Sequence, residues 1–430
     1  MTVPVTASNP EPGVTKTVLA DGIRVVTERV PGALSVCLGV WVGVGSRDEP
    51  TSVAGVSHFL EHLLFKGTER RSARDIARAV DAVGGEMNAF TAREHTAYYT
   101  RLPAAEIGLG LDLLTDVLTA PALREREIES EREVILEELL LAGDTPEDLV
   151  HIALYEALFP GHPLGRETLG SEETIEAMGR GAIAEFFDGR YRPANLVVAG
   201  AGDLDHERVV DAVGRAFAGR PAGDRPRRLG PTQANEALRI VRRPTEQAHV
   251  ALGWRALDHF DGDRYALQVL NEILGGGPSS RLFQEVREER GLAYSVYSSP
   301  SAYADAGALV AYAGTVPGRL AELLEVLDDV VARLAADGVD DEELAVAVGC
   351  LTGSLVLGLE DSASRMARLG TGETVRGEVV PVQEHLARVR AVTVDDVARV
   401  ADRVLRSPRT VAVVGPFDEH DRELARLAAR

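Results

Sequence analysis

The sequence predicts a protein built from two similar α/β domains, and three observations support this fold class. The chain has 430 residues, which is enough for two or three domains of about 150 residues each. A stretch rich in proline, glycine and arginine, "GRPAGDRPRRLGP", breaks the regular patterns from Gly219 to Pro231. The halves on its two sides resemble each other, which indicates a duplicated domain. We therefore expect domains at residues 1–219 and 232–430, joined by a linker at 220–231.

The likeness between the halves lies in one strand and the helix that follows it. In the first half "VCLGVWVGVG" precedes an apolar helix, and in the second half "HVALGWRALDHF" precedes "RYALQVLNEILGGG". Each half thus has a strand, an acidic loop and an apolar helix that ends at glycine. The second helix carries Gln268, Asn271 and Glu272 where the first carries two histidines and a glutamate. We therefore expect a shared fold without a shared chemistry.

The first half begins with strand signals. "TKTVLADGIRVVTERV" predicts two strands around a turn at Asp21-Gly22, and "LSVCLGVWVGVG" predicts a longer third strand. "EMNAFTAREHTAYYTRL" predicts a hairpin, because aromatic and β-branched residues dominate it. Trp41 and Trp254 lie in apparent strands, so we expect both in the core.

Helices are predicted between these strands. An apolar helix ends at Gly67, and the next begins at Ser72, which can cap it together with Asp75 three residues later. A further helix is expected over about residues 124–141, with its stop at Gly143.

Charge and composition exclude several classes of function. The formal net charge of −21 repels phosphate backbones and argues against a nucleic-acid partner. No apolar run approaches the roughly 18 residues of a membrane span, and the N-terminus lacks the features of a secretory signal. The two cysteines, Cys37 and Cys350, form no disulfide framework, which suits a reducing compartment. We expect a cytoplasmic protein with no membrane partner.

Ionisable side chains interrupt the apolar helix of the first half. Nearly every residue of "VAGVSHFLEHLLF" is apolar, yet the run contains His58, Glu61 and His62. Burying such groups is unfavourable unless something compensates them. Residues four apart project from one helix face, so the two histidines can bind one metal ion while Glu61 accepts a proton from water. The alternative is a pair of hydrogen-bonded core histidines.

A third metal ligand is expected from another helix, because catalytic zinc usually has three protein ligands and one open position. The segment "EIESEREVILEELLLAG" is rich in glutamate. Glu131 and Glu138 are seven residues apart, about two helical turns, and therefore share a face. Spacing alone does not choose Glu138 over Glu137, and a solvated acidic helix face is the alternative.

Together these motifs resemble a known family. His58-x-x-Glu61-His62 is the inverted zinc motif, and with "SEREVILEEL" it is similar to the pitrilysin, insulysin and mitochondrial processing peptidase family of zinc metalloendopeptidases. Similar segments follow in the family's order across almost the whole chain: "GVSHFLEHLLFKGTERRSARDI", "GGEMNAFTAREHTAYY", "FPGHPLGRETLG", "YRPANLVVAGAGDLD" and "GGGPSSRLFQEVREERGLAYSVYS". The ordered series argues against a chance match.

The resemblance implies a role for each matching residue around the metal. It assigns one Zn²⁺ per chain to His58, His62 and Glu138. It makes Glu61 the catalytic base and Glu131 an additional acidic residue that supports catalysis.

The resemblance also implies residues that bind the substrate. Those expected to form an edge strand along an extended peptide are Asn88, Ala89, Phe90 and Thr91. Backbone hydrogen bonds along such a strand accept any sequence, and side-chain pockets select among sequences. Arg287 and Tyr294 match a family pair that orients the substrate and stabilises the oxyanion, which suits a cation and a phenol.

The architecture implied by the resemblance is α+β, with two homologous α/β sandwich domains of mostly antiparallel sheet that form half of a clamshell. Single-chain relatives contain both halves, so this chain is expected to form a homodimer in which Arg287 and Tyr294 serve the zinc site of the partner. The expected function is zinc-dependent hydrolysis of peptide bonds in short or unfolded peptides. The alternatives are a non-catalytic scaffold subunit of the same fold and a subunit that needs a separate partner chain.

Overall fold

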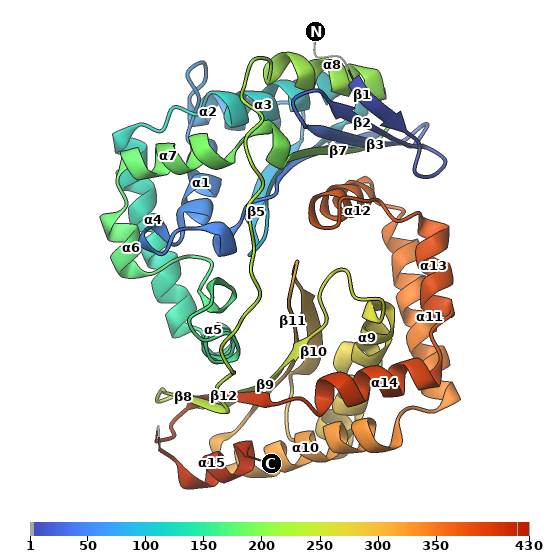
Figure 1. The fold of residues 1–430 in the computed structure, drawn as a ribbon. Helices are drawn as coiled ribbons and strands as arrows, with labels where there is room; N and C mark the ends of the chain where they lie inside the picture. Colours follow the sequence, from blue (N-terminus) through green and yellow to red (C-terminus); the bar gives the residue numbers. More distant parts are fainter. Residues whose placement is uncertain (1–3, 419, 430) are drawn as a thin grey trace. The chain divides into compact units, whose positions relative to one another are not determined.

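Each of the two parts of the chain is organised around one β-sheet (Figure 1). The computed structural model describes residues 4–418 and 420–429. The first unit comprises Met1–Leu139, Glu167–Arg227 and Val356–Val382. The second unit comprises Leu140–Arg166, Arg228–Leu355 and Gln383–Arg430. Neither unit is therefore continuous in sequence.

The first unit contains a seven-stranded sheet in the order β1-β2-β3-β7-β4-β6-β5. Its strands are β1 (Pro4–Ser8), β2 (Val14–Leu19), β3 (Arg24–Arg29), β4 (Ser35–Val42), β5 (Glu86–Thr91), β6 (Thr96–Pro103) and β7 (Leu196–Gly202). Only β3 and β7 pair in parallel; the other described neighbours are antiparallel. The predicted turn at Asp21-Gly22 and the hairpin of β5 and β6 are confirmed.

Helices cover both faces of the first sheet. They are α1 (Val56–Leu64), α2 (Ala73–Asp81), α3 (Ile107–Thr119), α4 (Glu125–Asp144), α6 (Glu172–Ala177), α7 (Arg180–Arg190), α8 (His206–Ala216) and α12 (Ser362–Val375). On one face α1, α3 and α8 share an apolar core with Val40 and Val198. On the opposite face of the sheet lies α12 (Figure 1). Its Met366 and Leu369 pack in a second cluster with Trp41. Alternate residues of one strand thus serve the two faces.

The ends of two predicted helices test the capping signals. Ser72 caps α2, because its side chain accepts from the Asp75 amide while the Asp75 carboxylate accepts from the Ser72 amide. The predicted stop of α4 at Gly143 is wrong by one residue, since the helix runs through Gly143 to Asp144. Glycine only weakens a helix, whereas Thr145 precedes a proline and is held in an extended conformation, which ends the helix.

The second unit contains a five-stranded sheet in the order β10-β11-β9-β12-β8. Its strands are β8 (Leu238–Arg242), β9 (Ala248–Ala256), β10 (Val296–Ala302), β11 (Gly307–Thr315) and β12 (Arg409–Gly415). The helices wholly or mostly in this unit are α5 (Pro146–Leu158), α9 (Arg264–Asn271), α10 (Leu320–Asp337), α11 (Asp341–Gly358), α13 (Val382–Arg390), α14 (Val394–Leu405) and α15 (Arg422–Ala428). On one face α9, α10 and α14 share a core with Trp254, and α5 packs on the other face.

The second sheet repeats five strands of the first. The order β8-β12-β9-β11-β10 matches β3-β7-β4-β6-β5, and in both series only the first pair is parallel. The two halves of the chain exchange one helix each. Helix α5, from the first half, packs on the second sheet, and α12, from the second half, packs on the first. Residues 220–231 contain no helix or strand, and their role as a domain linker stays a prediction.

Among the described residues, no single helix has the length and apolarity to cross a bilayer. Helices α11 and α12 reach that length and apolarity only when taken together as a bent pair. The cytoplasmic location stays a prediction.

Candidate metal centre

The start of α1 is fixed by a buried carboxylate and a glycine. Glu49 accepts hydrogen bonds from the backbone amides of Gly55 and Ser57 at 2.7 and 2.8 Å, which satisfies two donors at the helix N-terminus. Gly55 has φ of 93°, and a Cβ there would lie 2.5 Å from the Leu169 carbonyl oxygen. Glycine is therefore required at this turn, and the turn sets the direction in which His58 leaves the helix.

Three candidate ligands from α1 and α4 lie together. The side-chain ligand atoms of His58, His62 and Glu138 all lie within 4.8 Å of one another. Glu138 Oε2 is 3.5 Å from His58 Nε2 and 3.7 Å from His62 Nε2. Ligand atoms in a tetrahedral zinc site with bonds of about 2.0–2.1 Å are separated by roughly 3.3 Å. The group is therefore close to the size that one such ion requires.

The protonation of His58 suits a metal site. Burial, and to a smaller extent the neighbouring His62, lower the pKa of His58 to about 4, so its ring is neutral at pH 7. His58 Nδ1 is buried and has no hydrogen-bond partner among the described residues. Two imidazoles and one carboxylate form a donor set that Zn²⁺ accepts. The residues present therefore fit a zinc ion.

A second carboxylate orients His62. Glu131 is 4% exposed, and its Oε2 lies 3.1 Å from His62 Nδ1. Its other oxygen, Oε1, lies 2.7 Å from Lys66 Nζ. A carboxylate that accepts from Nδ1–H leaves the Nε2 lone pair for a metal, which is the usual outer-shell arrangement of metal-binding histidines. Glu131 therefore acts on the site through His62 in this structure.

Glu61 lies on the same helix and makes a different contact. Its Oε2 accepts a hydrogen bond from Thr91 Oγ1 at 2.6 Å. Burial raises the pKa of Glu61, and the Thr91 hydroxyl and His62 act against this rise. A carboxylate with a raised pKa, beside two imidazoles, is chemically suited to exchange a proton with water.

The predicted substrate strand is the edge of the first sheet. β5 contains Asn88, Ala89, Phe90 and Thr91 and, among the described strands, pairs only with β6. Phe90 is 40% exposed, whereas Ala89 is buried. An edge strand presents a row of backbone groups to which another extended chain can bond.

The predicted oxyanion pair lies in the second unit. The guanidinium carbon of Arg287 is 4.6 Å from the ring centroid of Tyr294 and 4.7 Å from that of Phe283. Tyr294 is 82% exposed, which is unusual for an aromatic side chain. The structure thus brings Arg287 and Tyr294 together as an exposed stacked pair.

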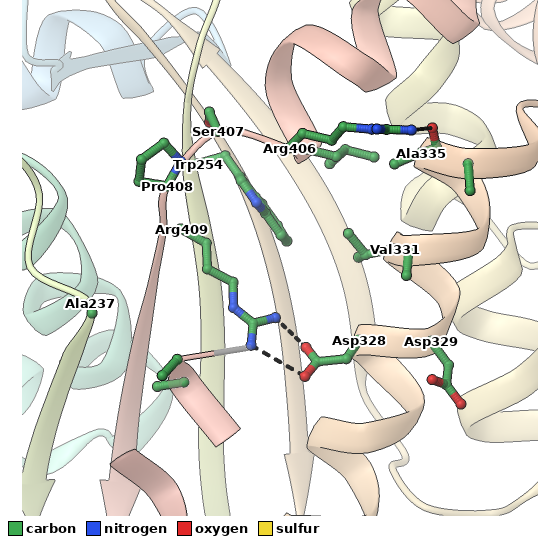
Figure 2. A pocket seen from close by; sticks show the side chains of 15 residues that line it. Ala237, Trp254, Asp328, Asp329, Val331, Ala335, Arg406, Ser407, Pro408 and Arg409 are labelled. Atoms are coloured by element: carbon green, nitrogen blue, oxygen red, sulfur yellow. Dashed lines mark hydrogen bonds and ion pairs between the residues drawn. The ribbon is translucent and has the colours of Figure 1, made fainter. Parts of the chain in front are cut away.

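A pocket of about 890 Å³ lies elsewhere in the second unit (Figure 2). Trp254 and alanines of α10 form its apolar part. Arg409 pairs with Asp328 across it and donates to the Leu427 carbonyl oxygen at 2.8 Å. Because its partly buried cation and anion bond to each other, we assign this pocket no chemical role.

Comparison with known proteins identifies the family. Residues 24–172 match the family described as Insulinase (Peptidase family M16), and residues 177–349 match the one described as Peptidase M16 inactive domain. The chain belongs to peptidase family M16. The resemblance found from the motifs is therefore confirmed. Within this M16 chain, the described metal-ligand group lies in the part that matches the first of the two descriptions.

Relatives of the M16 chain carry names that indicate zinc and proteolysis. An uncharacterised zinc protease of Mycobacterium tuberculosis is 47% identical over 406 residues, which covers 93% of either chain. One from Streptomyces coelicolor is 45% identical over 423 residues, or 96% of this chain and 92% of the relative. The uncharacterised zinc protease YmxG of Bacillus subtilis is 37% identical over 396 residues, or 92% and 97%.

Solved structures confirm the fold class. A peptidase M16 inactive domain from Pseudomonas fluorescens has a TM-score of 0.88 at 22% identity, and the match covers 95% of this chain and 99% of that one. A protease from Helicobacter pylori has a TM-score of 0.87 at 22% identity, with 96% and 100% covered. Likeness at this identity shows the mixed α/β fold.

Two contacts of the site escaped the sequence reasoning. Lys66 lies in the turn that follows α1 and binds Glu131, and a lysine only four residues after His62 was a usable local signal. The bond from Thr91 to Glu61 joins residues 30 positions apart and had no local signal. Glu137 is exposed and lies outside the ligand group, whereas Glu138 is in it.

Proposed function

We propose that this M16 protein is a zinc-dependent endopeptidase that hydrolyses peptide bonds in short or unfolded polypeptides, with one zinc ion per chain. The observation that carries the proposal is the grouping of His58, His62 and Glu138, whose ligand atoms lie within 4.8 Å of one another. Relatives named as zinc proteases support it.

The chemistry follows from the side chains around that group. A zinc ion held there would polarise the scissile carbonyl and acidify the attacking water. Glu61 accepts the proton of that water and delivers it to the leaving nitrogen. The raised pKa of Glu61 favours the first transfer, because it makes the carboxylate a stronger base. The protonated carboxyl group is then the acid that donates to the leaving nitrogen.

The edge strand β5 supports an extended substrate. A peptide that lies along β5 bonds to its backbone, so most of the binding energy is independent of sequence. A folded protein has already paired the backbone groups that this mode needs, whereas a short or unfolded peptide has not. Substrates of the second kind are therefore proposed.

The exposed pair of Arg287 and Tyr294 supports a homodimer with composite sites. In this proposal the pair of one subunit stabilises the oxyanion formed at the zinc site of its partner. Mixing Glu61→Gln with Tyr294→Phe tests the arrangement, because each heterodimer would contain one intact site. Random exchange of subunits should restore about one quarter of the wild-type activity. Light scattering that shows an active monomer would contradict the dimer.

The peptidase itself is tested by zinc analysis and by cleavage of a quenched peptide library, with and without a chelator. We expect stoichiometric zinc and chelator-sensitive cleavage. Glu61→Gln should retain zinc and lose about 10²- to 10⁴-fold in turnover, the usual contribution of a general base. A wild-type protein without bound zinc would refute the proposal.

A non-catalytic subunit is the second candidate. The description of the family matched by residues 177–349 names an inactive domain, which favours it. A zinc-loaded protein that binds peptides but never cleaves them would support this candidate. Cleavage that starts only when a co-purifying chain is added would instead identify a subunit that needs a separate partner.

A further inference from the structure

The hydroxyl of Thr91 is hydrogen-bonded to Glu61, the candidate base. Thr91 Oγ1 donates to Glu61 Oε2 at 2.6 Å, a short distance typical of a hydroxyl bonded to a charged carboxylate. It is the one hydrogen bond recorded for the Glu61 side chain among the described residues. Glu61 therefore depends on Thr91 for its orientation.

The sheet fixes the side of β5 on which Thr91 lies. Side chains alternate along a strand, so Met87, Ala89 and Thr91 share one face, while Asn88 and Phe90 share the other. Ala89 is buried in the core that contains residues of α1, and Met87 packs against that core. Thr91 thus faces α1 because the strand it ends is packed there.

Two restraints hold the Thr91 hydroxyl in place. Thr91 pairs with Thr96 of β6 at the end of the hairpin, which fixes its backbone. A β-branched side chain has few rotamers at χ1, so a fixed backbone also limits the hydroxyl position. The bond occupies Oε2 of Glu61 and leaves Oε1 for a water molecule.

We propose that Thr91 is a positioning residue, whose hydroxyl holds the Glu61 carboxylate ready to accept the proton of the attacking water. The inference rests on the proposed peptidase function and extends it. Because Thr91 ends the strand on which the peptide would pair, substrate binding and base placement share one structural element.

The test compares three substitutions at two threonines. Thr91→Val removes the hydroxyl and keeps the shape of the side chain, and Thr91→Ser restores a hydroxyl. Thr100→Val is the matched control, because Thr100 lies on the adjacent strand β6 and its buried Oγ1 has no hydrogen-bond partner among the described residues.

Four quantities are measured on zinc-loaded and zinc-free protein. For Thr91→Val we expect kcat to fall about 10- to 100-fold, the effect of one hydrogen bond to a charged group, with KM nearly unchanged. Zinc content should stay stoichiometric. The Kd of a fluorescent peptide for zinc-free protein, measured by anisotropy, should also stay unchanged. Thr91→Ser should recover most of kcat, and Thr100→Val should match the wild type.

The outcomes separate the inference from the proposed function. If Thr91→Val retained the kcat of Thr100→Val while wild type was active, Thr91 would have no positioning role. If KM and the Kd of the zinc-free protein rose while kcat held, the hydroxyl would instead contact the peptide. Inactivity of zinc-loaded wild type would overturn the peptidase proposal and this inference with it.

Discussion

The helices α1 and α9 occupy the same place in the two units but carry different side chains. Each follows the middle strand of the repeated five-strand order, which is β4 in the first sheet and β9 in the second. Helix α1 presents two histidines that group with Glu138, and the described residues of the second unit contain no comparable group. Helix α9 presents Gln268 and Asn271, and its continuation over Glu272–Gly276 is π-helical.

The two helices also share a contact with the edge strand. Thr91 of β5 donates to Glu61, and Ser298 of β10 donates to Asn271 Oδ1 at 2.8 Å. A hydroxyl between edge strand and helix therefore belongs to the architecture of both units. The proposed chemistry of the first unit depends on the group to which the hydroxyl donates, a carboxylate instead of an amide, and on the third candidate ligand, which comes from α4.

The largest effect is expected when α1 is made to resemble α9. His58→Gln places in α1 the residue type that α9 has at Gln268, and it removes one of three candidate ligands. Zinc should be lost and cleavage should fall about 10³-fold or more, because a metal supplies several kcal/mol of charge stabilisation. Zinc analysis and peptide cleavage measure both. Gln268→Ala should leave zinc content and cleavage unchanged. Loss of zinc in this variant would contradict the proposed difference between α1 and α9.

The exchanged helices α12 and α5 give the next comparison. A Cβ on Gly370 of α12 would lie 2.3 Å from the ring of Trp41, which the packed core cannot move aside. Gly370→Ala should therefore destabilise the protein by about 1–3 kcal/mol. A Cβ on Gly253, beneath α5, would lie 3.0 Å from the end of the Leu154 side chain, which can rotate. Calorimetry should show a smaller shift in Tm for Gly253→Ala; equal shifts would refute this account.

Lys66→Met tests charge compensation beside the metal group. Glu131 is buried and bonds to Lys66 Nζ, which is itself partly exposed, so loss of the cation should destabilise zinc-free protein by about 1–2 kcal/mol. The loss should shrink when zinc is bound, because the ion supplies positive charge nearby. Urea denaturation with and without zinc measures both values. Arg319→Met, in an exposed pair with Glu322, is the control: it should change stability less than Lys66→Met does, and equally with and without zinc.

The smallest effect is expected from Ser298→Ala. It removes the bond to Asn271 and should reduce stability by about 0.5–1.5 kcal/mol without changing kcat. Thr91→Val in the first unit should do the reverse, with a lower kcat and a similar stability. A fall in kcat for Ser298→Ala would show that the hydroxyl contact is not specific to the chemistry of α1.

Local spacing was enough to predict much of the site. His58 and His62 are four residues apart, and the helix follows from the apolar run around them. The spacing between the glutamates did not distinguish Glu138 from Glu137, but their positions relative to the buried isoleucines of α4 do. Ile128 and Ile135 are the buried apolar residues of α4. Residues three positions after them lie near that buried face, whereas residues two positions after them, such as Glu137, point away.

Contacts between distant segments could not be predicted in this way. The packing of α12 against Trp41 joins residues more than 300 positions apart, and it depends on the missing side chain of Gly370. The predicted domains at residues 1–219 and 232–430 do not include the exchange of α5 and α12. The sequence of an amphipathic helix shows that it has an apolar face but not which sheet covers that face. Tertiary packing decides that choice.

The exchange of helices has a consequence for synthesis on the ribosome. The strand that contains Trp41, β4, emerges early, but the helix that covers it, α12, is translated only at Ser362–Val375. An apolar sheet surface is thus left bare through most of translation, and folding of the first unit cannot finish until the chain is almost complete. During that interval we expect chaperones to bind the exposed apolar surface of the nascent chain, even though the finished protein is well packed.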